Sequence, residues 1–223
     1  MRKMIFYKEW LKTRWYLAAA LAVMAAMTFY CLLNLSKTAQ IRGGDMLWNL
    51  MILKETVLIE MLRYIPLVVG GLLAVFQFLP EMTRKRLKLT LHLPYPQGRM
   101  IAAMYGYGLG VLFVLFLLQA LCLGTALHGW MAGELVGRIL RTAAVWYLAG
   151  FAAYIWIAAV CLEPTWGMRV ALLLLLVGLV HLLTLSSVPE AYNGILPWLS
   201  LYVLCGQLLI FHSVARFKEG LQD

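Results

Sequence analysis

The chain has 223 residues, of which 63% are hydrophobic and 13% charged, and its formal net charge is +9. Water-soluble domains usually carry about 25% charged residues, so this composition excludes an ordinary soluble domain. We expect an all-α integral membrane protein embedded in the lipid bilayer, because a helix satisfies its own backbone hydrogen bonds where no water is present.

The first 14 residues show an amphipathic helical pattern. On a helical wheel the apolar side chains gather on one side: Met4, Phe6, Tyr7, Trp10 and Leu11. The polar side chains fall on the other: Lys8, Glu9, Lys12 and Thr13. This pattern predicts an interfacial helix over residues 1–14 that lies in the inner headgroup layer before the chain turns into the first span. The alternative is a basic start that only orients the chain.

Six apolar stretches follow, each long enough to cross a bilayer, for which about 17–25 residues suffice. They comprise residues 16–35, 58–79, 99–127, 142–162, 170–187 and 191–215. The second stretch contains Glu60 and Arg63 near its start. These residues either lie in the membrane, where charge is rare and often functional, or precede a span that starts at Tyr64. The sequence leaves both alternatives open.

The Lys and Arg residues are distributed unevenly between the two sides of the membrane. If the N-terminus is cytoplasmic, 13 of the 19 lie on the inner side and 6 on the outer side. The positive-inside rule then predicts a multi-pass protein with both termini in the cytoplasm. We expect its location to be the bacterial cytoplasmic (inner) membrane. The outer connectors, near 36–57, 128–141 and 188–194, are too short to form an external domain.

Glycine pairs inside the spans are typical of close helix packing. The segment Gly106-Tyr-Gly-Leu-Gly110 lies in an apolar stretch and follows no strand, so it does not indicate a nucleotide site. With Ala102, its outer glycines instead form a small-xxx-small stripe, which lets helices approach closely. We interpret Gly70-Gly71 in the second span in the same way.

Motifs for chemistry are missing from the sequence. It contains no GxxxxGK[ST], HExxH or GxSxG, so we expect no catalytic residue, no metal site and no enzyme activity in this chain. We also expect no nucleic-acid partner. Four histidines leave open a membrane-embedded haem or redox protein, which would need two of them at one depth: His92, His128, His181 and His212. A structural membrane subunit without a transport path is a further alternative.

Polar residues within the spans have two possible roles. They either line a translocation path or form hydrogen bonds between helices. The candidates for a path are Glu60, Arg63, Gln77, Gln119 and Gln207.

The segment 81–99, between the second and third apolar stretches, is a basic connector bounded by Pro80 and by Pro94-Tyr-Pro96. It carries five of the 19 Lys and Arg residues. Leucines alternate with polar residues in its middle, which is strand periodicity. A lone strand at a membrane surface would leave its edges unpaired, so we expect a helix here.

The amphipathic start, the six spans and this connector together resemble the permease subunits of ABC-2 type ABC transporters. In that family the connector carries an acidic residue, a Gly-Thr-Leu, a leucine-rich stretch, Leu-Pro and a basic residue. The matching residues here are Glu81, Leu87, Leu89, Leu91, Leu93, Pro94 and Arg99. Lys85-Arg86 stands where the family usually has Gly-Thr.

The resemblance implies the transmembrane subunit of an ATP-driven transporter, with export as the family tendency. The connector would be a coupling helix that docks on a separate cytoplasmic ATP-binding cassette ATPase, which binds ATP and Mg²⁺. A second copy of the chain, or a homologous permease, would complete the complex. The residues expected at the ATPase contact are Glu81, Arg84, Lys85, Arg86, Leu87, Lys88, Leu91 and Arg99.

Overall fold

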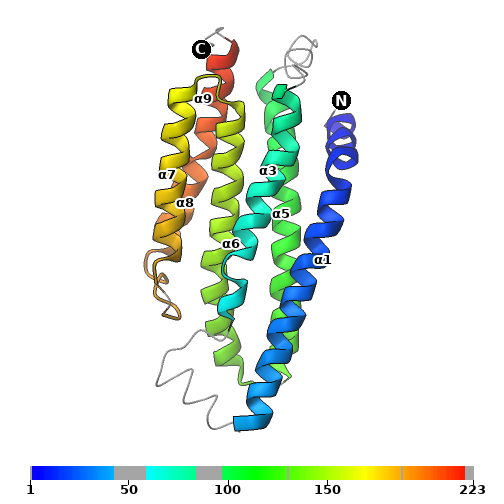
Figure 1. Ribbon diagram of the computed structural model, residues 1–223, viewed down its shortest axis with the longest axis vertical. Coiled ribbons are helices and arrows are strands. Elements are labelled where there is room, and N and C mark those ends of the chain that lie inside the picture. The colour runs from blue at the N-terminus through cyan, green and yellow to red at the C-terminus, as the bar shows by residue number, and fades with distance from the viewer. Residues whose placement is uncertain (1, 43–58, 84–96, 130, 187, 219–223) are drawn as a thin grey trace.

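The computed structural model describes residues 2–42, 59–83, 97–129, 131–186 and 188–218. Over these residues the chain is helical and contains no β-sheet, and its helices run side by side in one elongated bundle (Figure 1). Six helical segments are long and apolar enough to cross a membrane, which confirms the expected number of spans. They are Lys3–Lys37, Glu60–Met82, Gly98–His128, Gly133–Leu162, Trp166–Thr184 and Leu196–Arg216.

The helix α1 (Arg2–Arg42) runs without a break through the first span. The expected boundary between a helix over residues 1–14 and the first span is therefore not seen, because residues 2–14 and the span belong to one continuous helix. Glu9 and Thr13 on the polar face are buried in the bundle, whereas Met4 and Tyr7 on the apolar face are exposed. The polar face of α1 therefore packs against other helices of the bundle.

The centre of the bundle is α6 (Gly133–Leu162), which contacts α3, α5, α7, α8 and α9. Its closest neighbour is α3 (Ile65–Thr83), which follows the short 3₁₀-helix η2 (Glu60–Leu62). A Cβ added to Gly70 would lie 2.0 Å from the carbonyl oxygen of Gly150, so the two backbones are in contact. The packing role expected for Gly70-Gly71 is confirmed, since a Cβ on Gly71 would also lie 2.9 Å from the side chain of Ile157.

Two helix boundaries differ from the sequence prediction. The fourth apolar stretch starts at residue 142, but α6 begins at Gly133, so most of the expected outer connector 128–141 is helical. Its polar residues belong to a helix that extends past the apolar region, and Glu134 in the first turn suits the positive end of the helix dipole. Pro80 does not bound α3 but lies in its last turn, where the missing N–H affects only the helix end. By contrast, α5 (Gln97–His128) matches its prediction within two residues at each end.

The last span is made of two helices. After α7 (Trp166–Thr184), residues 188–195 form turns, and α8 (Leu196–Cys205) and α9 (Gln207–Lys218) follow. The expected span 191–215 therefore starts too early and is interrupted at Gly206. A Cβ on Gly206 would lie 2.9 Å from the indole nitrogen of Trp156, so a larger residue here would have to displace that side chain. Both chain termini lie at the same end of the bundle, as six spans require (Figure 1).

Candidate functional site

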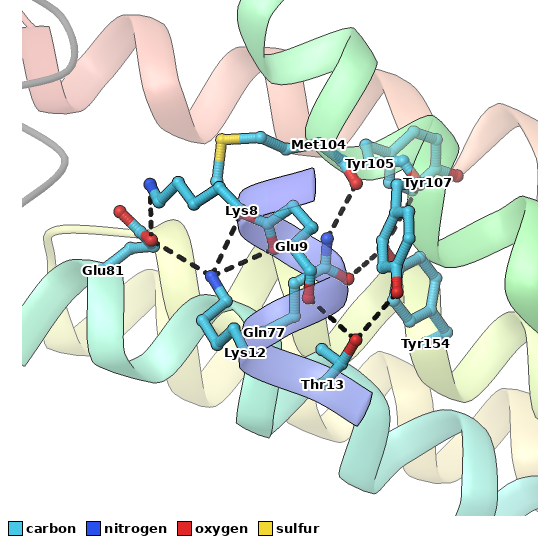
Figure 2. Close-up of polar contacts among 10 residues, drawn as sticks. All are labelled: Lys8, Glu9, Lys12, Thr13, Gln77, Glu81, Met104, Tyr105, Tyr107 and Tyr154. Atoms are coloured by element: carbon cyan, nitrogen blue, oxygen red, sulfur yellow. Dashed lines mark hydrogen bonds and ion pairs between the residues drawn. The ribbon is translucent and has the colours of Figure 1, made fainter. Parts of the chain in front are cut away.

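A mostly buried group of residues joined by polar contacts lies near the end of the bundle that carries both chain termini (Figures 1 and 2). It involves four helices, and we call it the polar cluster. Its members are Lys8, Glu9, Lys12 and Thr13 of α1, Gln77 and Glu81 of α3, Met104, Tyr105 and Tyr107 of α5, and Tyr154 of α6.

Two lysines and two glutamates form the charged half of the polar cluster. The Lys12 Nζ atom lies 3.0 Å from Glu9 Oε2 and 3.0 Å from Glu81 Oε1, and Lys8 Nζ lies 2.9 Å from the same Glu81 oxygen. The side chains of Glu9 and Glu81 are 0% and 1% exposed. Buried charge is tolerated only when it is paired, and here two ammonium groups balance two carboxylates.

Hydroxyl groups connect the charged half to α5. Thr13 donates to the backbone carbonyl of Glu9 at 2.9 Å, and its oxygen lies 2.9 Å from the Tyr107 hydroxyl. Because the single Thr13 proton is used by the carbonyl, the Tyr107 hydroxyl is the donor in the second bond. The polar face of α1 is therefore bound to α3 by ion pairs and to α5 by a hydrogen bond.

The neutral half of the polar cluster joins α3, α5 and α6 (Figure 2). Gln77 donates through Nε2 to the Met104 carbonyl at 2.7 Å and accepts the Tyr154 hydroxyl through Oε1 at 2.8 Å. Gly108 makes room for this bond, since a Cβ there would lie 2.0 Å from the Tyr154 hydroxyl oxygen. Both Gln77 and Tyr154 are fully buried, so these bonds replace lost solvent contacts.

The polar cluster lies beside the two ends of the connector. The helix α3 ends at Thr83, two residues after Glu81, and α5 resumes at Gln97. Since α1 holds α3 through Glu81 and α5 through Tyr107, a movement of the connector that separates α3 from α5 must change contacts of α1. The arrangement can therefore transmit a displacement from the connector to the first span.

A second charged group at the same end joins α6 to α9. Glu163 is fully buried, and its Oε1 atom lies 2.9 Å from Arg216 Nη1 and accepts the Thr165 hydroxyl at 2.9 Å. Arg169 donates through Nε to the Glu163 backbone carbonyl at 2.7 Å. The cation that pairs with Glu163 therefore comes from the C-terminal helix α9.

Further ion pairs lie at the opposite end of the bundle. Glu190, whose φ is +61°, has its carboxylate 2.8 Å from Arg141 Nη1 and 3.7 Å from Arg138 Nε. Glu60 and Arg63 approach each other to 3.5 Å, with side chains 62% and 11% exposed. Both precede Ile65, where the regular helix α3 begins, although the apolar window that could cross the membrane starts at Glu60.

The candidate path residues have different neighbours. Gln77 belongs to the polar cluster, whereas Gln119 of α5 donates to the Thr28 hydroxyl of α1 at 3.1 Å. Gln207 is the first residue of α9, immediately after the break at Gly206. Glu60 and Arg63 lie near the other end of the bundle from the polar cluster. The structure thus distributes these residues over separate contacts between helices.

The expected contacts to an ATPase lie only partly within the described chain. Glu81 is buried and its carboxylate is held by α1, so it does not present a free surface to a partner. Arg99, in the first turn of α5, is exposed. The remaining contact residues and the expected coupling helix lie outside the described residues: Arg84, Lys85, Arg86, Leu87, Lys88 and Leu91.

The described histidines stand on three different helices. His128, His181 and His212 are exposed on α5, α7 and α9, and His92 lies outside the described residues. In the part of the chain that the structure describes, no group of three or more His, Cys, Asp or Glu residues could hold a metal ion. The geometry therefore lends no support to a haem or redox centre.

No protein-family model, curated protein or solved structure matches this chain. The functional argument therefore depends on the chain's own residues. Of the ten members of the polar cluster, sequence reasoning named Gln77 and Glu81 as candidate site residues and missed the other eight. Two features of the sequence could have pointed to the polar cluster. One is the polar helix face with Lys8, Glu9 and Lys12, and the other is the single acid Glu81 at the end of the second span.

Proposed function

We propose that this chain is the permease subunit of an ATP-driven ABC transporter, moved by a separate cytoplasmic ATPase that docks on residues 81–99. In this proposal the end of the bundle with both termini faces the cytoplasm, and the subunit works beside a second copy or a homologous permease. Export is the direction that the family resemblance favours.

The observation that carries the proposal is the buried ion cluster beside the connector. A membrane subunit without a nucleotide site can be driven only through contacts with a partner. Here the residue that begins the connector, Glu81, is bound at 2.9 and 3.0 Å to two lysines of the first span. A force on the connector therefore acts directly on α1.

In this proposal the polar cluster has two arrangements, each of which keeps its carboxylates paired. Separating a buried carboxylate from its partner costs about 3–5 kcal/mol, because an uncompensated charge remains in a low-dielectric region. An intermediate position with half-broken pairs is therefore unfavourable. ATP binding and hydrolysis by the partner would supply the free energy to move between arrangements.

The test is purification of the full-length chain in mild detergent from cells that also express a candidate cassette ATPase. We expect the ATPase to co-purify, and we expect the triple variant R84E/K85E/R86E to lose it. Lys3→Glu is the control, because it reverses an exposed charge at the same end of the bundle but outside the connector.

Two outcomes would contradict the proposal. One is full retention of the ATPase by the triple variant. The other is a wild-type chain that purifies alone although the ATPase is expressed and stable. Equal amounts of the variant and wild-type chains in the membrane fraction would show that charge reversal has not prevented insertion.

A further inference from the structure

A groove runs along the outer face of α1 and α5. It consists of two cavities of about 880 Å³ and 430 Å³, which share Leu21, Leu115 and Leu118 as lining residues. Gly106 and Gly110 line the larger cavity. The groove is therefore a continuous concave surface at the boundary between two spans.

The depth of the groove follows from the two glycines. No described atom outside its own helix lies within 4 Å of a Cβ added to Gly106 or Gly110, in contrast to Gly108 between them. The stripe that the sequence assigned to helix packing thus faces outward, and within the described chain no helix covers it. With no side chains at these positions, a ligand can approach the backbone of α5.

Arg14 is the one charged residue among the described residues that line the groove. Arg14 lines the larger cavity together with Trp10 and stacks at 5.6 Å on the ring of Trp15. Glu9 and Glu81, the carboxylates of the polar cluster at the same end of the bundle, are bound by Lys8 and Lys12 instead. Tryptophan beside a basic residue is typical of headgroup depth, and basic pockets between spans bind anionic lipid headgroups.

We propose that this groove binds an anionic phospholipid of the cytoplasmic leaflet. Its phosphate contacts the Arg14 guanidinium, and one acyl chain lies over Gly106 and Gly110 toward Leu118. From Gly106 to Leu118 the helix rises about 18 Å at 1.5 Å per residue. One leaflet of a hydrocarbon core about 30 Å thick measures about 15 Å, so the groove matches the length of one acyl chain.

A second copy of the chain fits the charge of the groove less well. A parallel copy would need an acid at the depth of Arg14, but the exposed carboxylates of the described residues, Glu60 and Glu134, lie at the other end of the bundle. The inference uses the orientation given under the proposed function, but it does not require an ATPase partner.

Native mass spectrometry of the full-length chain, released from detergent with phosphatidylglycerol or phosphatidylcholine added, tests the proposal. We expect about tenfold more phosphatidylglycerol than phosphatidylcholine to be retained, the effect of one charge-assisted contact. Arg14→Gln should abolish this preference. Gly106→Leu should lower retention of both lipids, because it fills the floor of the groove where no neighbouring atom obstructs the new side chain.

Matched controls separate the site from general effects. Arg99→Gln removes an exposed cation at the same end, and Gly178→Leu enlarges a glycine on α7 that also has open space around it. Both should behave as wild type. Equal lipid preference in Arg14→Gln and wild type would overturn the proposal. So would a change from dimer to monomer in Gly106→Leu with unchanged lipid retention, because the groove would then hold a second copy. Since ATPase co-purification is a separate measurement, either proposal can fail alone.

Discussion

Replacement of Lys12 by methionine tests the polar cluster most directly. Methionine keeps an unbranched side chain of similar length but removes the ammonium group that both Glu9 and Glu81 contact at 3.0 Å. Lys8 would then be the one cation of the cluster facing two carboxylates that are 0% and 1% exposed. The variant therefore leaves an excess buried negative charge between α1 and α3.

The expected loss in free energy of unfolding is about 3–5 kcal/mol, the usual effect of removing one partner from a buried ion pair. For a chain of this size, that corresponds to a fall in melting temperature of roughly 6–20 °C. The 16% exposure of the Lys12 side chain places the effect toward the lower end. Adding Glu9→Gln to Lys12→Met restores the charge balance, so the double variant should recover about half of the loss or more.

Thermal unfolding of the purified full-length chain in detergent, followed by intrinsic tryptophan fluorescence, measures these differences. Lys37→Met is the matched control, since it removes an exposed lysine from the same helix and should change stability by less than about 0.5 kcal/mol. Equal melting temperatures of Lys12→Met and Lys37→Met would contradict the expected role of the Lys12 ammonium group. This role is also refuted if Glu9→Gln destabilises the Lys12→Met background further, because charge balance would then not hold the cluster together.

Three further substitutions test other contacts by the same melting assay. Gly70→Ala should lower the free energy of unfolding by about 1–3 kcal/mol or more, because its Cβ would lie 2.0 Å from a backbone oxygen of α6. The control Gly178→Ala should have little effect. Similar melting temperatures of the two variants would mean that α3 and α6 are not in backbone contact. Gly108→Ala should lower the free energy of unfolding by about 1–3 kcal/mol, because its Cβ would displace the buried Tyr154 hydroxyl from Gln77. An unchanged melting temperature would contradict this hydrogen bond. In the Glu163→Gln background, Arg216→Met should change the melting temperature little, because the 2.9 Å ion pair between the two side chains is already lost. Additive effects of the two substitutions would show that the side chains do not interact.

The spans were predictable because the bilayer imposes a length on apolar segments. The third stretch, 99–127, lies inside α5 with nearly the same ends. The first nine residues of α6 were taken for a connector because they include charged residues, and hydropathy does not show where a helix begins. The break at Gly206 was not predicted either, and the close approach of Trp156 to this glycine is a contact between helices that the sequence does not show.

The polar cluster was missed for a different reason. The helical wheel correctly separated the two faces of residues 1–14, but the polar face was assigned to water. Its burial depends on Glu81, which is 69 residues from Lys12 in sequence, and on the hydroxyl of Tyr107. A single sequence shows which residues are polar, but not which polar residues neutralise one another across helices. The basic residues 84–88, which the sequence favoured as the contact surface, lie outside the described residues.

The uninterrupted course of α1 has a mechanical consequence. Its 41 residues extend about 62 Å, roughly twice the thickness of the hydrocarbon core. Such a rod converts a small tilt into a large displacement: rotation by about 10° around its midpoint moves each end by about 5 Å, close to one helical turn. A change in the contacts of Lys12, near one end of α1, would therefore displace the other end of the helix while α1 itself stays intact.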